Sequence, residues 1–299
     1  MSAELSSLVG PLVLFLLMIS VGLELTLADF RRVAAAPRAV LGGTLVQLIS
    51  LPLLTWAVVA LLDVPPVFGA GAVLIAVSPG AGISNVLVAA AGANIALSIT
   101  LTALASVLCV VTLPTVAAVG MRAFLGDSIA IDVPVGLIMG QLAVSLLLPI
   151  GLGMAIRARR RGFVERYRRR IQQIAMLLIG VIIAVSMISS GGGELDMSDA
   201  SAGFLAAGVW TLAAMAIGWL TAAGLGLSGP DRFTFLIEFS TRNIAVAAIV
   251  AMSGLQRLDL ALFSGAYVAV GYPLAFGAVA LRRWLQPGSE AARHTDAQA

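Results

Sequence analysis

Apolar runs long enough to cross a lipid bilayer follow one another along most of this chain. Hydrophobic residues make up 60% of the 299 positions, and charged residues make up only 11%. A helix needs about 20 apolar residues to span the hydrocarbon layer of a membrane. A water-soluble globule of this length would not keep so apolar a chain in solution. The sequence therefore predicts an all-α polytopic membrane protein.

Polar breaks divide the apolar sequence into nine predicted transmembrane helices. Their predicted bounds are residues 8–27, 39–62, 68–91, 95–124, 133–156, 171–190, 200–227, 233–253 and 260–284. Because nine is an odd number of crossings, the two ends of the chain are expected on opposite sides of the membrane.

The arginines set the expected orientation, because cytoplasmic loops of membrane proteins are enriched in basic residues. All 18 basic residues are arginines, and most fall in alternate loops of the predicted topology. The opposite loops hold only Arg122 and Arg257, together with several acidic residues. We expect a protein of the cell inner (plasma) membrane with its N-terminus outside and its C-terminus in the cytoplasm. Since the positive charge follows topology, no nucleic-acid partner is expected.

Eight arginines between Arg157 and Arg170 divide the chain near its middle. We expect residues 1–156 to hold the first half of an internal repeat and the start of the second half. Residues 157–170 would form a basic cytoplasmic connector, residues 171–286 the rest of the second half, and residues 287–299 a polar cytoplasmic tail. A lipid-binding or regulatory role is the alternative for the connector.

The chain has one cysteine, Cys109, and one histidine, His294. A disulfide within the chain is therefore excluded, and neither a histidine metal centre nor a Ser-His-Asp triad is expected. No arrangement of residues points to an enzyme.

The third predicted span is interrupted by Ser78, Pro79, Gly80 and the residues up to Asn85. Proline removes a backbone donor, and glycine weakens a helix. Carbonyls freed in this way are tolerated inside a membrane only where they line a cavity or are buried by protein. We predict a broken helix here, with a simple proline kink as the alternative.

The eighth predicted span is interrupted by Glu238, Arg242 and Asn243. Charged side chains inside a membrane are costly and usually functional. An ion pair between Glu238 and Arg242, which are four residues apart, is the structural alternative. The two interrupted spans hold corresponding positions and run in opposite directions. This pattern predicts two inverted repeats whose broken helices cross at the binding site of a secondary transporter.

At these residues the sequence resembles the bile acid:sodium symporter family. The resemblance extends over nearly the whole chain and includes residues 21–25, Gln47 followed by Pro52, the Ser84-Asn85 pair and residues 97–102. It implies a nine-helix member that lacks the first helix of ten-helix relatives. It also implies a core domain, which carries both broken helices, and a separate panel domain.

The resemblance implies one sodium ion as the coupled cation. Its ligands would be Ser84, Asn85, Ser98, Thr102 and Glu238. Oxygen ligands and a negative charge in a site of low dielectric constant suit a hard cation. For the Ser98 and Thr102 hydroxyls, the alternative is a hydrogen bond to the carbonyl one helical turn earlier.

A second sodium site is doubtful in this chain. The resemblance would build it from Gln47, Glu238, Phe239 and Thr241, but Arg242 stands where the family has a glutamine. An arginine only donates hydrogen bonds and cannot bind sodium. We hypothesise that the guanidinium occupies or neutralises this position, paired with Glu238, so that at most one sodium is coupled per cycle. The alternative is that Arg242 binds a carboxylate of the substrate.

The implied substrate is an organic anion, either bile-acid-like or a small carboxylate. Its expected site lies near Gly82, Asn85, Arg242 and Asn243. The expected function is sodium-coupled uptake by alternating access. The second hypothesis is a sodium-independent or proton-coupled carrier, in which Glu238 carries the proton. The third is a non-transporting membrane sensor or an intramembrane enzyme.

Overall fold

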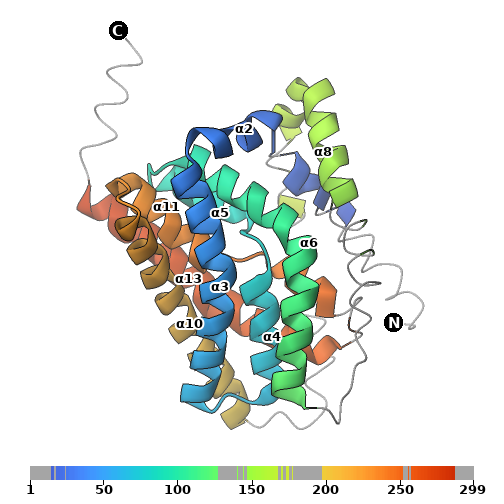
Figure 1. Cartoon of the computed structure of the whole chain (residues 1–299), viewed down its shortest axis with the longest axis vertical. Coiled ribbons are helices and arrows are strands. Elements are labelled where there is room, and N and C mark those ends of the chain that lie inside the picture. Colours follow the sequence, from blue (N-terminus) through green and yellow to red (C-terminus); the bar gives the residue numbers. More distant parts are fainter. Residues whose placement is uncertain are drawn as a thin grey trace.

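The computed structural model describes residues 15–126 except 17 and 24, residues 147–167, 197–251, 255 and 257–286, and the isolated residues 140, 144, 170, 173, 174 and 177. The described helices are α2 (Leu27–Ala35), α3 (Pro37–Leu62), α4 (Pro66–Val77), α5 (Gly82–Ala90), α6 (Ile95–Leu125), α8 (Leu148–Arg159), α10 (Met197–Gly224), α11 (Gly229–Ser240), α12 (Ile244–Ile249), the short 3-10 helix η4 (Leu258–Ala261) and α13 (Leu262–Leu285). They form a bundle whose long helices run roughly side by side (Figure 1).

Four helical segments within the described residues are long and apolar enough to cross a membrane. These segments are Pro37–Leu62, Ile95–Leu125, Asp199–Gly224 and Asp259–Leu285. The described part is otherwise helical as well and has no β-strand beyond one isolated bridge. The chain is thus a multi-pass, all-α membrane protein. The total of nine crossings remains a prediction, because residues 178–190 and most of 127–146 lie outside the described part.

Both predicted interruptions are present. Residues 78–81 are not helical and separate α4 from α5, and residues 241–243 separate α11 from α12. The simple proline kink is therefore the wrong description of the third span. Each interrupted span is a pair of shorter helices with extended backbone between them.

The first predicted span ends earlier than expected. The helix runs only to Gly22, and α2 begins at Leu27 after a turn. Thr26 starts the new helix, because its backbone N–H (2.7 Å) and its hydroxyl (2.6 Å) both donate to the Asp29 carboxylate. The stretch between the first two predicted spans, residues 28–38, is therefore largely helical, and Arg31 lies on α2.

The surface of α3 shows which side of that helix meets the lipid. Leu45, Ile49 and Leu53 are 55–61% exposed, whereas Gln47 and Leu51 between them are buried. Exposed apolar side chains of this size in a regular row fit contact with acyl chains. The buried side of α3 faces α4, α6 and α10.

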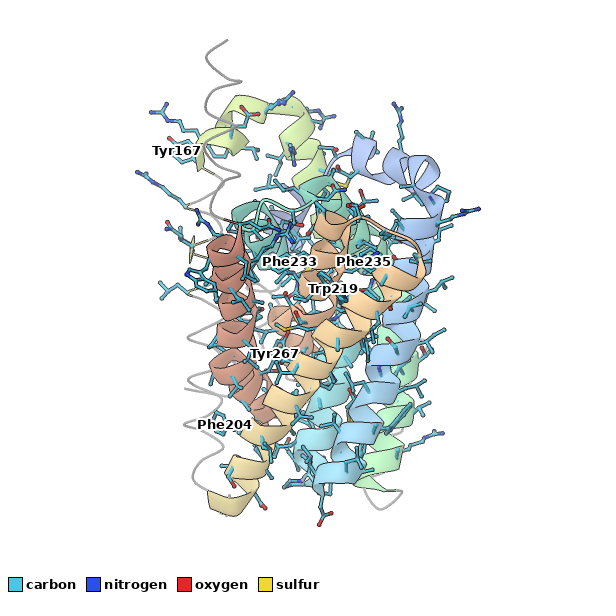
Figure 2. The ribbon with its side chains drawn as sticks, turned by 90° about the vertical axis from the view of Figure 1, so that its left-hand side faces the viewer. Tyr167, Phe204, Trp219, Phe233, Phe235 and Tyr267 are labelled. Atoms are coloured by element: carbon cyan, nitrogen blue, oxygen red, sulfur yellow. The ribbon has the colours of Figure 1, made fainter. Side chains whose placement is uncertain are left out.

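The interior of the bundle contains large aromatic side chains. Phe235 and Tyr267 are fully buried, and Figure 2 shows them on two different helices of the same side of the molecule. Close helix packing is supported by small residues. A Cβ atom on Gly218 of α10 would lie only 2.5 Å from the Phe235 carbonyl oxygen of α11. This contact holds α11, which carries Glu238, closely against α10.

The arginine-bearing segments share one end of the bundle. α2, the C-terminal part of α8 and the beginning of α11 all lie at the upper end in Figure 1. They carry Arg31, Arg157 and Arg232 respectively. This is the end of the bundle for which the arginines predict a cytoplasmic position.

Candidate functional site

The two helix interruptions cross each other and pair through their backbones. The Ala81 N–H donates to the Thr241 carbonyl (3.2 Å), and the Asn243 N–H donates to the Pro79 carbonyl (2.9 Å). Gly80 and Arg242 form an antiparallel bridge between these bonds. Backbone N–H and C=O groups that have no partner within their own helix are thereby paired with the other interruption. The crossing of the two broken helices, expected from the sequence, is present.

Gly80 lies at the closest point of this crossing. A Cβ atom on this residue would be 2.6 Å from Glu238 Oε2 and 2.8 Å from Thr102 Oγ1. Any side chain here would therefore displace the Glu238 carboxylate and the Thr102 hydroxyl or push the first interruption away from them. From the sequence, Gly80 was predicted only as a helix breaker, and this second requirement was not predicted.

The Glu238 carboxylate is surrounded by hydroxyl groups. Its Oε1 atom accepts hydrogen bonds from Ser84 and Ser98, and its Oε2 atom accepts one from Thr102 at 2.9 Å. Asn85 joins this group, because its Oδ1 atom lies 2.7 Å from the Ser98 hydroxyl. All five side chains are at most 8% exposed. The structure thus brings together the residues that were predicted to hold the first sodium ion.

The hydroxyls of Ser98 and Thr102 do not bond to the carbonyls one turn earlier. Both are directed at Glu238 instead. By contrast, the neighbouring Thr100 does bond to the Ala96 carbonyl, at 2.7 Å. The alternative reading of Ser98 and Thr102 is therefore wrong, and only these two of the three hydroxyls face the crossing.

Two hydroxyls in this group each lie close to two oxygen atoms. The Ser98 hydroxyl contacts both Asn85 Oδ1 and Glu238 Oε1, and the Ser84 hydroxyl contacts both the Ala81 carbonyl and Glu238 Oε1. A hydroxyl has one proton to donate, so each of these two hydroxyls can donate to only one of its two neighbouring oxygens at a time. A small cation would satisfy these oxygens. The described residues contain no group of three or more His, Cys, Asp or Glu that could hold a metal ion, and an all-oxygen set suits a hard cation.

Arg242 lies in a second, separate set of oxygen atoms. Its side chain is fully buried. Nη1 donates to Gln47 Oε1 (3.0 Å) and to the Glu238 carbonyl (3.3 Å). Nη2 donates to the Ala76 carbonyl (3.4 Å) and to the Ser78 carbonyl. The guanidinium thus binds four oxygens from α3, α11 and the end of α4.

The expected pairing of Arg242 with Glu238 needs a correction. The guanidinium bonds to the backbone carbonyl of Glu238, and among the ion pairs of the described residues none joins the two side chains. Two causes are visible. The Glu238 carboxylate already accepts from three hydroxyls, and the last carbonyls of α4 have no helical donors left. The sequence analysis did not anticipate Ala76 and Ser78 as partners of Arg242.

Other residues predicted for the second sodium site have different partners. The Thr241 carbonyl accepts the Ala81 N–H, and its hydroxyl donates to the Ile237 carbonyl. Phe239 is buried and stacks on Phe235, with ring centroids 5.8 Å apart. Of the predicted set, Gln47 and Glu238 are the residues that contact the guanidinium.

The residues predicted for the substrate lie at the starts of the second half-helices. Gly82 is the first residue of α5. Asn243 precedes α12, and its side chain accepts the Val246 N–H at 3.2 Å. Arg242 was also predicted to contact the substrate, but in this conformation its guanidinium is directed at oxygen atoms of the protein.

Two tyrosines of α13 hold the second interruption, and the sequence analysis assigned them no role. Tyr267 accepts the Arg242 N–H at 2.9 Å and donates to the Ser240 carbonyl, and Tyr272 donates to the Arg242 carbonyl at 3.1 Å. Both backbone groups of Arg242 are thereby satisfied by side chains. The usable signal was the presence of two tyrosines in an apolar span, since a buried tyrosine hydroxyl needs a partner.

A family model described as the sodium bile acid symporter family matches residues 11–194 of this chain. The "Probable sodium/metabolite cotransporter BASS1, chloroplastic" of Arabidopsis thaliana is 27% identical over 234 residues, covering 78% of this chain and 56% of that relative. The "Uncharacterized sodium-dependent transporter YocS" of Bacillus subtilis is 25% identical over 253 residues, covering 83% of this chain and 76% of that relative. The "P3 protein" of Homo sapiens is 24% identical over 243 residues, covering 80% and 50%. The chain thus spans about half the length of the plant and human relatives.

Proposed function

Because the chain belongs to the sodium bile acid symporter family, a family of membrane transporters and not of enzymes, we propose that it is a secondary transporter that couples sodium entry to uptake of an organic anion. The observation that carries this proposal is the group of oxygen atoms around Glu238 at the crossing of the two interruptions. A charged residue buried in a transmembrane bundle, with only hydroxyl donors around it, is placed to bind a cation.

The proposed sodium ligands are the side-chain oxygens of five residues on three elements. They are Ser84 and Asn85 of α5, Ser98 and Thr102 of α6, and Glu238 of α11. Since α5 lies beyond the first interruption and Glu238 comes just before the second, sodium binding would stabilise the crossing itself. This gives a physical route from ion occupancy to the arrangement of the two broken helices.

We assign the second cation position to the Arg242 side chain. Its guanidinium is bonded to Gln47 and to the Glu238 carbonyl, which are oxygens that a second ion would otherwise use. A tethered positive charge in this place would leave one exchangeable sodium per cycle. Movement of one sodium with one monovalent anion would then carry no net charge across the membrane.

The substrate would bind beside the crossing, near Gly82, Asn85 and Asn243. α5 and α12 both begin there. Half-helices that start at the centre of a transporter point their positive ends toward anionic substrates. The substrate class proposed is an organic anion, either bile-acid-like or a small carboxylate.

Alternating access completes the proposal. Nine transmembrane helices in two inverted repeats would form a core domain with both broken helices and a panel domain. The first half and the start of the second would occupy residues 1–156, the connector 157–170, the remainder 171–286, and the tail 287–299. The protein would lie in the plasma membrane, with the N-terminus outside and the arginine-bearing end in the cytoplasm.

The test is uptake by the purified full chain in liposomes. Labelled bile-acid conjugates and small carboxylates are offered under three conditions, namely an inward sodium gradient, an equal potassium gradient, and an imposed pH difference without sodium. Sodium-driven accumulation of at least one anion is expected. Accumulation that follows the pH difference and ignores sodium would contradict sodium coupling.

A sodium-independent or proton-coupled carrier is the second candidate. It is favoured by one specific observation, the buried guanidinium of Arg242, which adds a fixed positive charge within four residues of Glu238. In that case Glu238 would carry a proton in place of sodium. The pH arm of the uptake experiment separates the two candidates.

A further inference from the structure

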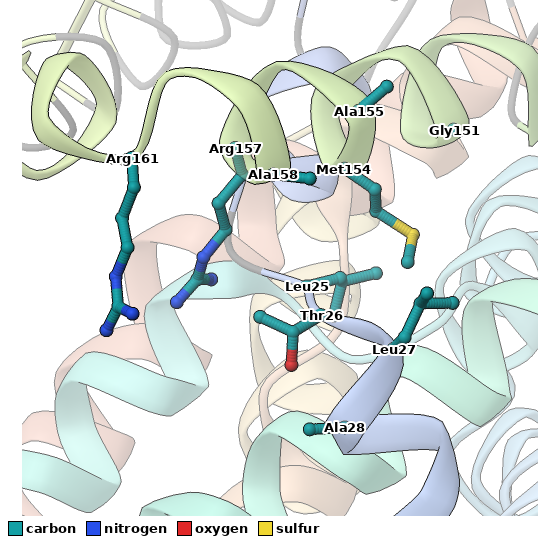
Figure 3. A pocket seen from close by; sticks show the side chains of 10 residues that line it. All are labelled: Leu25, Thr26, Leu27, Ala28, Gly151, Met154, Ala155, Arg157, Ala158 and Arg161. Carbon is teal, nitrogen blue, oxygen red and sulfur yellow. The ribbon is translucent and has the colours of Figure 1, made fainter.

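A cavity of about 690 Å³ lies between α2 and α8, away from the helix crossing. It is lined by Leu25–Ala28 from the start of α2 and by residues of α8 and the segment after it, including Met154, Arg157 and Arg161. Figure 3 shows Met154 and Leu27 on one side of this space and the two arginines on the other. Its volume is within the usual range for small-ligand sites.

The two ends of the cavity differ in chemistry. Leu25, Leu27, Ala28 and Met154 present apolar atoms, while Arg157 and Arg161 present guanidinium groups that extend in the same direction (Figure 3). Arg157 also donates to the Leu23 carbonyl at 3.2 Å, which fixes its position beside the cavity. Arg161 pairs with Glu165 through Nε at 2.9 Å, but both side chains are more than 60% exposed (79% and 67%). Such an exposed pair is weak.

Two acidic residues, Glu24 and Asp29, adjoin the cavity-lining residues in sequence. Asp29 accepts hydrogen bonds from the Thr26 N–H and hydroxyl. Around the arginines the connector is strongly basic, since it also contains Arg159, Arg160 and Arg166. The site therefore favours a ligand with negative charge.

The surroundings of the cavity favour a lipid over a soluble anion. Leu27 is 71% exposed, Phe163 is 54% exposed and Leu152 is 44% exposed. In a multi-pass membrane protein such side chains meet acyl chains. The arginines lie beside this apolar surface, at the end of the bundle predicted to be cytoplasmic, where lipid phosphates are expected.

We propose that this cavity binds one anionic phospholipid. Its phosphate would contact Arg157 and Arg161, and the upper part of an acyl chain would pack against Met154, Leu25 and Leu27. The bound lipid would link α8 to α2, which continues almost directly into α3. α3 carries Gln47, which accepts a hydrogen bond from Arg242. A bound lipid would therefore also stabilise the position of Gln47 beside Arg242.

The experiment measures lipid retained by the detergent-purified full chain, using native mass spectrometry with phosphatidylglycerol as the probe and phosphatidylcholine as the uncharged comparison. The test variant is the double substitution Arg157→Gln and Arg161→Gln. The matched control is Arg159→Gln with Arg160→Gln, which removes the same charge from the same segment but does not touch the cavity lining. A basic side chain near a lipid headgroup is worth roughly fivefold in affinity, so about a 25-fold loss is expected for the test pair.

Two further variants keep the outcome clear if Arg157→Gln disturbs folding through its bond to Leu23. Arg161→Gln alone should weaken phosphatidylglycerol binding about fivefold. Ala158→Trp fills the cavity without changing charge and should remove the lipid as well. Inorganic phosphate and glycerol 3-phosphate should not compete for the site, since neither has an acyl chain.

Three results would overturn the proposal. One is an equal loss of phosphatidylglycerol in both double variants, which would show general attraction to the basic connector. Another is normal lipid retention by Ala158→Trp. The third is displacement of the lipid by inorganic phosphate, which would identify a site for a soluble anion.

Discussion

Glu238 and Arg242 are opposite charges four residues apart, both buried at the same crossing, yet their surroundings differ in kind. The Glu238 carboxylate accepts from three side-chain hydroxyls. The Arg242 guanidinium donates to one amide oxygen and three backbone carbonyls. Neither uses the other's side chain as its partner. The two charges therefore form two sites and not one ion pair.

The difference lies in which groups can change partners. A hydroxyl can rotate and turn its oxygen toward a cation, whereas a carbonyl at the end of a helix is fixed by the backbone. Under the proposed function, the Glu238 site would therefore exchange an ion at small structural cost. The Arg242 site holds a charge that belongs to the chain and that is bonded to four protein oxygens.

Gly80→Ala should have the largest effect on this pair of sites. Its Cβ atom would meet Glu238 Oε2 at 2.6 Å and Thr102 Oγ1 at 2.8 Å, so the Glu238 and Thr102 side chains would have to shift or the crossing would have to open. We expect complete loss of uptake and of sodium-dependent stabilisation. The control is Gly277→Ala on α13, where a Cβ atom meets nothing within 4 Å. Normal uptake by Gly80→Ala would show that the crossing is not as close as described.

Thr102→Val tests the role of the hydroxyl groups around Glu238. It removes one donor to Glu238 while keeping the shape of the side chain. It thereby also removes an oxygen proposed as a sodium ligand, and since a polar contact to a charged group contributes about 1.5–3 kcal/mol, a loss of sodium affinity of roughly tenfold or more is expected. The affinity is measured by titrating sodium against thermal stability.

Thr100→Val is the matched control for this change. Thr100 is two residues away on the same helix, but its hydroxyl bonds to the Ala96 carbonyl. Its sodium affinity should stay within about twofold of the wild type. Equal losses in both variants would mean that the α6 helix, and not the Glu238 site, was disturbed.

Arg242→Gln tests whether the tethered charge replaces an ion. Glutamine offers an oxygen in place of the guanidinium, so the position could accept a second sodium. We expect the number of sodium ions per substrate to rise from one to two and uptake to become sensitive to membrane potential. The measurement is the ratio of labelled sodium to labelled substrate in liposomes.

A second possible result for Arg242→Gln would point to the alternative role of this residue in substrate binding. An unchanged ratio together with a collapse of substrate affinity would show that Arg242 binds the substrate carboxylate. Arg242→Met, which offers neither charge nor oxygen, separates the two roles further. It should lose the fixed charge without gaining the second ion.

Tyr267→Phe and Tyr272→Phe should have the smallest effects and should differ from each other. Tyr267 makes two hydrogen bonds to the second interruption, and Tyr272 makes one. A neutral hydrogen bond contributes about 0.5–1.5 kcal/mol, and 1 kcal/mol lowers Tm by about 2–4 °C in a domain of 150–250 residues. The larger decrease in Tm is expected for Tyr267→Phe. The reverse order would contradict this account of the interruption.

The features predicted correctly from sequence are those in which one residue type has one physical meaning in a membrane. Pro79 and Gly80 had to break a helix, and Glu238 had to have polar partners if it was buried. The hydroxyls of Ser84, Ser98 and Thr102 were assigned to the same site through the family resemblance, and the structure places them together.

The features that were missed depend on pairings between distant segments. No pattern in the sequence indicated that Arg242 would bond to the carbonyls of Ala76 and Ser78, because every residue has a carbonyl. The helix α2 was missed because hydropathy detects only apolar runs of spanning length, and α2 is short and carries Arg31. The bracing by Tyr267 became visible only once α13 was placed beside the crossing.

The most direct test of the central claim is a thermal-shift titration of the purified full chain with sodium and, separately, with potassium, on the wild type and on Glu238→Gln. Glutamine keeps the size of the side chain and removes its charge. At a concentration of 100 times Kd, a ligand stabilises a protein by about 2.7 kcal/mol. The wild type should therefore show a rise in Tm with sodium that potassium does not reproduce, and Glu238→Gln should show none. An equal rise with both ions, or a sodium-specific rise that survives in Glu238→Gln, would contradict a sodium site at the helix crossing.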